Sequence, residues 1–242
     1  MKLPSVTGRR LLALVLPIAV AGGAAGSAAV AQVGGLLPGL DFSKDPPRRA
    51  LPPPRDNQVI ANVPLGQATP LIANGASVGR DVALYFSSGT GPAVRSPAAP
   101  AGSPERYIDP ATLPGGTLGD GITITEAQGI NALQRIQENL ASVGLGLGDV
   151  ISMRVFLDNP PGEAAADFAG WNRAYRQFFA NTNLDTGEPL VVPLGTREPA
   201  PPMVVTAARP SRTALEVASL PVAGWLVEVE VVARFDRARR WR

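Results

Sequence analysis

The sequence predicts an α+β domain that follows a long N-terminal extension. Segments with the two-residue alternation of strands and segments with the spacing of amphipathic helices follow one another in the order strand, helix, strand, helix, strand, strand. The 26 glycines and 25 prolines crowd the N-terminal half and two later stretches, so the packed domain is shorter than the 242-residue chain. A chain of this length supplies one core, or at most two.

Residues 1–31 have the pattern of an export signal peptide. An arginine pair precedes an uncharged apolar run from Leu11 to Val20, and Ala29-Val30-Ala31 supplies small residues for cleavage. A retained membrane anchor is the alternative, because the uncharged stretch is long enough to span a bilayer. Pro17 and the glycine- and alanine-rich second half favour cleavage. We therefore expect an exported, periplasmic protein that meets the membrane only through its signal.

The chain after the signal divides into a tether, a domain and a tail. Residues 32–64 contain two proline runs among isolated charges and no sustained apolar period, which is typical of a disordered tether. The domain is expected at residues 65–236, with inserted loops at 91–121 and 181–209. Residues 237–242 form an arginine-rich tail, which is expected to be solvated.

The first half of the domain contains one predicted strand and one predicted helix. Val82 to Phe86 is a short apolar and aromatic run that ends in Ser87-Ser88-Gly89, as a strand does at a turn. The loop 91–121 is too polar and broken to be expected in the core. Thr125 and Gln128 then predict a capping box, and apolar residues recur at helical spacing until Gly144.

The second half repeats the alternation of strand and helix. Residues 150–157 alternate in hydropathy as a strand does, and residues 164–180 place aromatic side chains at helical spacing. After the proline-rich loop 181–209, two β-rich runs cover Thr213 to Leu220 and Trp225 to Phe235. Because a short link joins them, they are expected to pair with each other.

Composition excludes several classes of function. The chain has no histidine and no cysteine, which removes the usual zinc, haem and iron–sulfur ligand sets and any Ser-His-Asp nucleophile. Catalysis would have to use carboxylates, arginine, hydroxyls or backbone groups. Without the three basic residues of the signal, 19 of the 22 basic groups remain against 20 acidic ones. This balance gives no support to nucleic-acid binding.

Five sequence strings resemble proteins of the RidA/YjgF family, and they occur in the order found in that family. The strings are Phe86-Ser87-Ser88-Gly89; Gly148-Asp149-Val150-Ile151 with Val155-Phe156-Leu157; Phe168 to Tyr175 with Phe178-Phe179; Pro210 to Val217 with Leu220-Pro221; and Val227-Glu228-Val229-Glu230. The resemblance implies a chorismate-mutase-like α+β fold, with a sheet backed by two helices. It also implies a homotrimer with clefts between subunits.

The resemblance also implies a site. Arg212 matches the arginine that binds the substrate carboxylate, a task that suits the two parallel hydrogen bonds of a guanidinium. Glu228 matches a carboxylate near the bound water, and its alternative role is that of an exposed strand residue. Ser88 and Asn172 match polar positions of the cleft, although either one could instead be structural. Arg212 and Glu228 are thus the candidate catalytic pair, and Arg212, Ser88 and Asn172 the candidate substrate-binding set.

Two positions depart from the family pattern, and the loops 91–121 and 181–209 are longer than the resemblance predicts. Leu71 and Ala214 stand where family members often carry Tyr and Cys, which leaves a more apolar pocket. The loop 181–209 leads directly into Arg212, so its residues, Arg209 among them, are candidates to reach the cleft.

Three functions remain open at this point. The leading hypothesis is hydrolysis of reactive 2-enamine or 2-imino acids to 2-keto acids and ammonia, which requires no cofactor and no metal. The second is a non-catalytic protein that binds small carboxylates or another protein. The third is an amide-type hydrolase that uses the same cleft.

Overall fold

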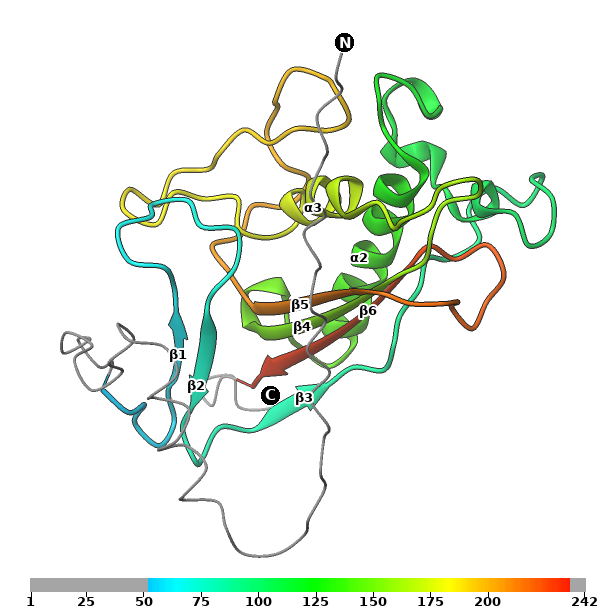
Figure 1. The fold of residues 1–242 in the computed structure, drawn as a ribbon. Coiled ribbons are helices and arrows are strands. Elements are labelled where there is room, and N and C mark those ends of the chain that lie inside the picture. The colour runs from blue at the N-terminus through cyan, green and yellow to red at the C-terminus, as the bar shows by residue number, and fades with distance from the viewer. Residues whose placement is uncertain (1–51, 236–242) are drawn as a thin grey trace, which may run out of the picture. The chain divides into compact units, whose positions relative to one another are not determined.

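A four-stranded mixed sheet organises residues 52–235, the part of the chain that the computed structural model describes. The strand order is β3-β6-β4-β5, in which β4 runs parallel to β5 and β6 runs antiparallel to both β4 and β3. Two helices, α2 (Ile124–Ser142) and α3 (Phe168–Arg176), pack against each other; in Figure 1 α2 runs behind the strands and α3 lies above β5. The strands are β3 (Leu84–Phe86), β4 (Val150–Leu157), β5 (Ser211–Glu216) and β6 (Val227–Arg234). The predicted α+β fold with a sheet backed by two helices is confirmed.

The alternation along β6 determines which face of the sheet is buried. Val227, Val229 and Val231 are buried in the main core, whereas Glu228 and Glu230 are partly exposed. This is the pleat of a strand that is covered on one side only. The core thus lies between the sheet and the two helices.

The opposite face of the sheet carries apolar side chains that no described segment buries completely. Phe156 lies opposite Leu215 on β5 and Glu228 on β6, so these three residues share that face. Phe86 lies opposite Val232 on the same face. Phe86 is 66% exposed and Leu215 is 50% exposed. We refer to this surface as the open face.

A hairpin of β1 (Val59–Asn62) and β2 (Gly75–Val78) precedes the sheet. The expected tether reached residue 64, so the structure differs from the prediction at β1. The difference arises because β1 gains its backbone hydrogen bonds from β2, a partner that local hydropathy does not reveal. Residue Ala73 also forms a parallel bridge with Ser211 at the start of β5, which ties the hairpin to the sheet.

Helix α2 begins two residues earlier than the sequence suggested. The hydroxyl of Thr123 accepts a hydrogen bond from the Glu126 backbone N–H at 3.1 Å, so Thr123 is the N-cap. Thr125 lies inside the helix and is buried, and the predicted capping box of Thr125 and Gln128 is therefore wrong. The helix gives way to Gly144 with φ of 75°, close to the predicted end.

Strands β5 and β6 do not pair with each other, which corrects the expected closing hairpin. Each pairs with β4, which lies between them. The chain leaves β4, passes through α3 and the loop 181–209, and returns as β5 parallel to β4. Such a parallel return requires a long crossover, so closeness in sequence was a poor guide to pairing here.

The loop 91–121 forms a small second core, contrary to expectation. Ile108 and Leu113 are buried against Ile122 and Ala127. Three short 3₁₀ helices shape this loop, at Pro104–Tyr107, Pro110–Thr112 and Pro114–Gly116. The loop has little periodicity because single side chains, rather than a regular face, bury its apolar surface.

Two buried amides of α2 hold this loop in place. The Gln128 side chain donates to the carbonyls of Pro104 and Gly224, and it accepts a hydrogen bond from the Leu226 backbone N–H. Asn131 binds both backbone groups of Ala93 and the carbonyl of Tyr107. Both amides are fully buried. They satisfy backbone groups that would otherwise be buried without partners.

The predicted signal (1–31), most of the tether and the predicted tail (237–242) lie outside the described residues. Signal cleavage and export therefore stay predictions. Within residues 52–235, none of the helices combines the length and the hydropathy required to cross a bilayer.

We predict that Gln128→Ala lowers stability far more than Gln137→Ala on the same helix. The first change leaves three buried backbone groups without partners, at about 1–3 kcal/mol each, so we expect a loss of roughly 3 kcal/mol or more. Gln137 is partly exposed, and its side chain makes no hydrogen bond within residues 52–235, so its replacement should cost less than about 0.5 kcal/mol. Thermal unfolding measures both. Equal losses in the two variants would refute the role given to Gln128.

Candidate functional site

Arg212, at the start of β5, lies against the face of α3. Its Nη2 donates to the Asn172 Oδ1 at 2.7 Å, and its guanidinium carbon lies 4.5 Å from the centre of the Tyr175 ring. Asn172 and Tyr175 are three residues apart, so both project from the same side of α3. The hydrogen bond and the cation–π contact together fix the orientation of the guanidinium plane.

Two polar contacts between α2 and α3 hold Asn172 in this position. Glu126 is fully buried and accepts from Arg173 Nε at 2.9 Å and Nη2 at 2.8 Å. Its second oxygen accepts from the Gly195 backbone N–H, which ties the loop 181–209 to the same carboxylate. At the start of α3, Asp167 caps the helix through the Gly170 N–H and accepts from the Thr123 hydroxyl at 2.5 Å.

The charge of Arg212 is not compensated within residues 52–235. It forms no ion pair there, and its Nη1 is buried without a hydrogen-bond partner. Burial lowers the pKa of Arg212 below the usual value for arginine. Arginine nevertheless keeps its proton in proteins, so the site holds a cation with a free donor. An anion that supplies acceptors to this donor would remove the cost of leaving it unpaired.

Tyr175 lies at the centre of a wider group of cations. Burial raises its pKa well above the usual value for tyrosine, although Arg212, Arg209 and Arg176 all act to lower it. The hydroxyl donates to the Leu71 carbonyl at 3.1 Å, and the ring stacks on Phe179. Tyr175 is therefore a neutral, buried support for Arg212.

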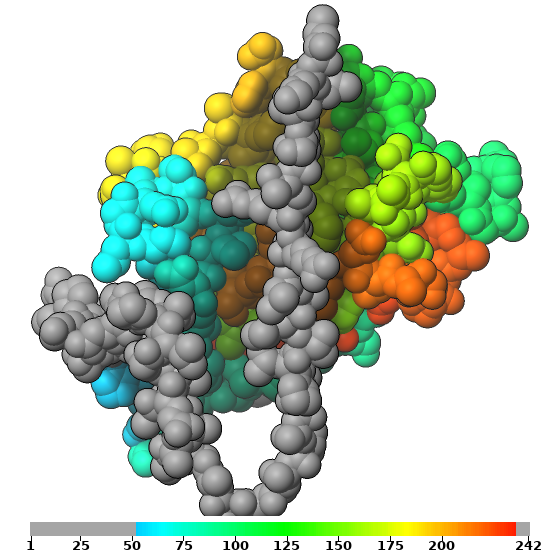
Figure 2. All heavy atoms as spheres, in the orientation of Figure 1, coloured from blue at the N-terminus to red at the C-terminus, as the bar shows by residue number. Residues whose placement is uncertain are grey.

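Arg209 holds segments together rather than facing a ligand. It is 4% exposed and donates to the carbonyls of Pro70, Thr182 and Ala207. These bonds join the segment before β2 to both ends of the loop 181–209. In Figure 2 that loop (yellow to amber) lies beside the segment 63–74 (cyan). The sequence analysis named Arg209 as a residue that could reach the cleft. In the structure its side chain instead anchors the two ends of the loop 181–209.

Arg176 is a site residue that the sequence analysis did not identify. It follows Asn172 by four residues, so the two lie on one side of α3. It donates to the carbonyls of Ala180 and Thr69 at 2.8 and 3.3 Å. A cavity of about 360 Å³ lies beside it, lined by Leu71, Asn172, Arg173, Arg176, Val191, Val192 and Pro193. Its spacing from Asn172 was the only signal available in the sequence.

Glu228 lies against Gly89, in the turn that also contains Ser88. A Cβ atom added to Gly89 would lie 1.8 Å from Glu228 Oε1, so the carboxylate occupies space that only glycine leaves open. Ser88 is exposed in the same turn, while the neighbouring Ser87 hydroxyl accepts from the Val231 N–H. Burial, and then the charge of Glu230, raise the pKa of Glu228.

Of the four predicted residues, the structure brings Arg212 and Asn172 into contact, whereas Glu228 and Ser88 lie near one turn elsewhere. Arg212 lies opposite Met153 and shares its helix-facing side, whereas Glu228 is on the open face. In register, Glu228 is two strands across and three residues along from Arg212, which corresponds to roughly 14 Å between Cα atoms. Arg212 with Asn172 and Glu228 with Ser88 do not share one cleft within a single copy of the chain.

The two departures from the family pattern lie beside Arg212. Leu71 lines the cavity next to Asn172, and Ala214 is half-buried two residues along β5. Both positions supply apolar surface where a hydroxyl or thiol would add a hydrogen bond. The polar side chains beside these two positions are Arg212, Asn172 and Arg176.

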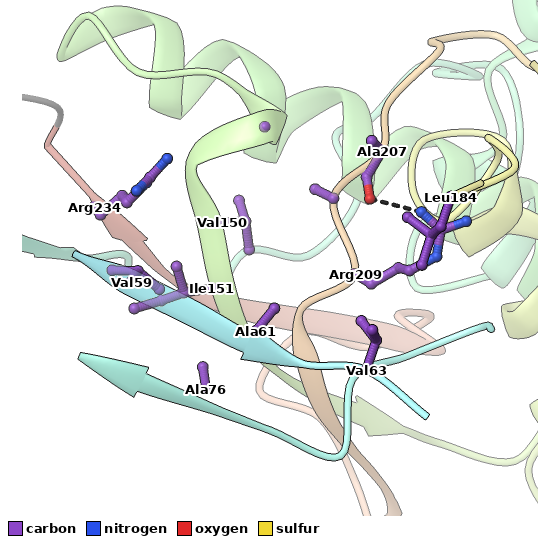
Figure 3. A pocket seen from close by; sticks show the side chains of 12 residues that line it. Val59, Ala61, Val63, Ala76, Val150, Ile151, Leu184, Ala207, Arg209 and Arg234 are labelled. Carbon is purple, nitrogen blue, oxygen red and sulfur yellow. Dashed lines mark hydrogen bonds between the residues drawn. The ribbon is translucent and has the colours of Figure 1, made fainter. Parts of the chain in front are cut away.

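A second cavity, of about 250 Å³, lies between the β1–β2 hairpin and the start of β4. Figure 3 shows its aliphatic walls, with Arg234 on one side and Arg209 bonded to the Ala207 carbonyl on the other. Arg212 and Asn172 do not line it. We place the candidate site at Arg212 because its Nη1 is buried without a partner and its hydrogen-bond partner Asn172 lines the cavity of about 360 Å³.

The chain was compared with known proteins and solved structures. No curated protein matches it. Among solved structures, TdcF of E. coli, solved with bound serine, has 21% identity and a TM-score of 0.35, with 76% of this chain and 93% of TdcF covered. YyfB, a Rid-family protein of Yersinia pestis, has 14% identity and a TM-score of 0.39, with 74% and 99% covered. A YjgF-family protein of Mycobacterium tuberculosis has 19% identity and a TM-score of 0.33, with 74% and 100% covered.

The family model described as endoribonuclease L-PSP matches residues 115–235, which is half of the chain. The match runs from the second half of the loop 91–121 through α2, β4, α3 and β5 to the end of β6. It includes Asn172, Arg212 and Glu228, and it begins after Ser88. The chain therefore belongs to the endoribonuclease L-PSP family, the YjgF/Rid family that its sequence strings resemble.

Proposed function

We propose that this protein hydrolyses reactive 2-enamine or 2-imino acids to 2-keto acids and ammonia. The observation that carries the proposal is the state of Arg212: oriented by Asn172 and Tyr175, without an acidic partner in the described chain, and with a buried Nη1 that lacks an acceptor. A substrate carboxylate supplies the missing negative charge and the missing acceptor. A guanidinium also fixes the plane of that carboxylate, and with it the position of the adjacent C2 atom.

Glu228 provides the second chemical group. In the proposed reaction Glu228 accepts a proton from water as the water oxygen forms a bond to the imine C2. The proton taken by Glu228 is passed to the nitrogen, which gives a carbinolamine; the remaining O–H proton then follows it to the nitrogen as the C2–N bond breaks, so that ammonia leaves and C2–O becomes the ketone. Each turnover consumes one water and releases one keto acid and one ammonia, so no oxidant or cofactor is required. The raised pKa of Glu228 suits a group that must accept a proton and return it.

Because Arg212 and Glu228 lie on opposite faces of one chain, the reaction requires a second copy. We propose that the copies associate through the open face, as a homotrimer, and that Ser88 and Glu228 of one copy complete the cleft at Arg212 of another. The exposed Phe86 and Leu215 on that face support self-association. We further propose that the chain acts after export, where an oxidase or a dehydratase in the same compartment supplies the imine.

A non-catalytic carboxylate-binding protein is the second candidate. Leu71 and Ala214 favour it, because they remove two polar groups from the pocket. In both functions Arg212 binds the carboxylate, but only imine hydrolysis requires Glu228. The two predictions below therefore separate them.

We predict that Arg212→Ala lowers kcat/KM for imine hydrolysis by roughly 10- to 100-fold, the effect of losing charge-assisted hydrogen bonds. The imine is generated in situ from 2-aminobutanoate by an amino-acid oxidase, and the enzyme's effect is measured against trapping by semicarbazide. Arg212→Lys should recover only part of the activity, because an ammonium lacks the planar fork. Arg80→Ala, at an exposed ion pair with Asp56, is the control and should have no effect. If wild-type protein that is folded and self-associated does not accelerate hydrolysis, the proposed function is wrong.

We predict an acidic limb in the pH profile of kcat/KM that lies above the pKa of an ordinary glutamate. Burial and Glu230 raise the pKa of Glu228, so activity falls as the pH drops through that raised value. Glu228→Gln should abolish the limb and lower kcat by roughly 100-fold or more. Glu230→Gln, on the same strand and face, should keep the limb but move it to lower pH.

Thermal unfolding separates this effect from misfolding. A carboxyl group whose folded pKa is raised stabilises the fold below its unfolded pKa, and this contribution is lost as pH rises through the folded pKa. At neutral pH, Glu228→Gln should therefore not lower the Tm. A limb that persists unchanged in Glu228→Gln would remove Glu228 from the mechanism.

A further inference from the structure

Three arginines surround Tyr175 without a carboxylate among them. Arg176, Arg209 and Arg212 all act on the tyrosine electrostatically, and none forms an ion pair within residues 52–235. Other arginines of this region do have acidic partners, for example Arg173 with Glu126 at 2.8 Å. A local excess of positive charge in a partly buried place favours an anionic ligand.

A single carboxylate at Arg212 leaves part of this charge uncompensated. Arg209 is 4% exposed and its guanidinium donates to three backbone carbonyls and the Thr182 hydroxyl, so it is not available to a ligand. Arg176 is only partly buried, lines the 360 Å³ cavity, and has two hydrogen bonds, both to neutral carbonyls. A guanidinium has five donors, so Arg176 retains donors for a ligand in that cavity.

Asn172 connects this cavity to Arg212. It lines the cavity and also accepts the hydrogen bond from Arg212 Nη2. Arg176 follows one helical turn later, about 6 Å along α3. The two carboxylates of a five-carbon 2-keto diacid are separated by a comparable distance. A ligand of this length can therefore extend from Arg176 to Asn172, the residue that is hydrogen-bonded to Arg212; Arg212 itself does not line the cavity.

The long loop 181–209 forms part of the cavity wall. Val191, Val192 and Pro193 of that loop form one side, and Leu71 forms another. Val192 is buried and exchanges two backbone hydrogen bonds with Ala200, so this part of the loop has a defined shape. Apolar walls around a cation exclude water and strengthen its attraction for an anion.

We propose that the site selects ligands with two carboxylates: Arg212 and Asn172 hold the carboxylate next to the keto or imino carbon, and Arg176 binds the carboxylate at the far end. The inference rests on the proposed function for the role of Arg212. It adds the substrate class, 2-imino and 2-keto dicarboxylates, and it makes Arg176 the residue that sets specificity.

The test compares two stable keto acids by isothermal titration calorimetry with the full chain. 2-Oxoglutarate and 2-oxopentanoate have the same number of carbons and differ only in a terminal carboxylate or methyl group. The wild-type protein should bind 2-oxoglutarate at least about tenfold more tightly, the equivalent of one charge-assisted contact. The preference should weaken as salt is added, because Arg176 is partly exposed.

Arg176→Gln should reduce the ratio of the two dissociation constants to near one, whereas Arg176→Lys should keep part of the preference. Arg197→Gln is the matched control. It removes the same charge from the nearby loop, at an exposed ion pair with Asp120 away from the cavity, and it should leave the ratio unchanged. Circular dichroism and thermal unfolding confirm that each variant is folded. If Arg176→Gln does not fold, the wild-type ratio and Arg176→Lys still decide the question.

The outcomes for this inference and for imine hydrolysis are distinguishable. Equal affinity of the wild type for the two keto acids, or an equal effect of Arg176→Gln on both, overturns the dicarboxylate inference even if the protein hydrolyses 2-iminobutanoate. A preference that depends on Arg176, in a protein that accelerates no imine hydrolysis, supports the inference and overturns the proposed reaction. Loss of the preference in Arg197→Gln as well would mean that net charge alone attracts the diacid, and this too overturns it.

Discussion

The site depends on one buried carboxylate, that of Glu126. It is fully enclosed, it binds Arg173 through two nitrogens, and its other oxygen accepts the Gly195 N–H of the long loop. A buried charge of this kind persists only with a close, well-oriented partner, so α2, α3 and the loop must meet in one arrangement. That arrangement sets the direction of α3, and hence where its side chains meet Arg212.

The arginines near α3 fall into two groups: those with partners, which hold the fold together, and those without acidic partners, which are candidates to bind a ligand. Arg173 is paired with a carboxylate, Arg209 donates mainly to backbone carbonyls, and both hold segments together. Arg176, at the end of α3, and Arg212, at the start of β5, lack acidic partners in the described region. An uncompensated cation near the core destabilises the fold. Unpaired arginines at this site are therefore consistent with the binding of an anionic ligand.

Local pattern was a good guide to the elements and a poor guide to their partners. The strand at 150–157 and the alternation of Glu228 with buried valines follow from hydropathy alone, and the structure has both. The pairing of β5 with β4, the strand at Val59–Asn62 and the second core in the loop 91–121 did not follow. Each depends on contacts between residues distant in sequence or on single buried side chains. Neither produces a periodic hydropathy pattern along the chain.

For the site, the sequence by itself determined the family, the presence of Arg212 and Asn172, and the exclusion of histidine and cysteine chemistry. It did so because these are matters of residue identity and order. Only the tertiary structure decided that Arg212 and Glu228 lie on opposite faces, that Arg209 anchors a loop, and that Arg176 lines a cavity beside Asn172. The physical reason is that register, burial and charge compensation depend on which residues are neighbours in space. The order of residues along the chain does not determine those neighbours directly.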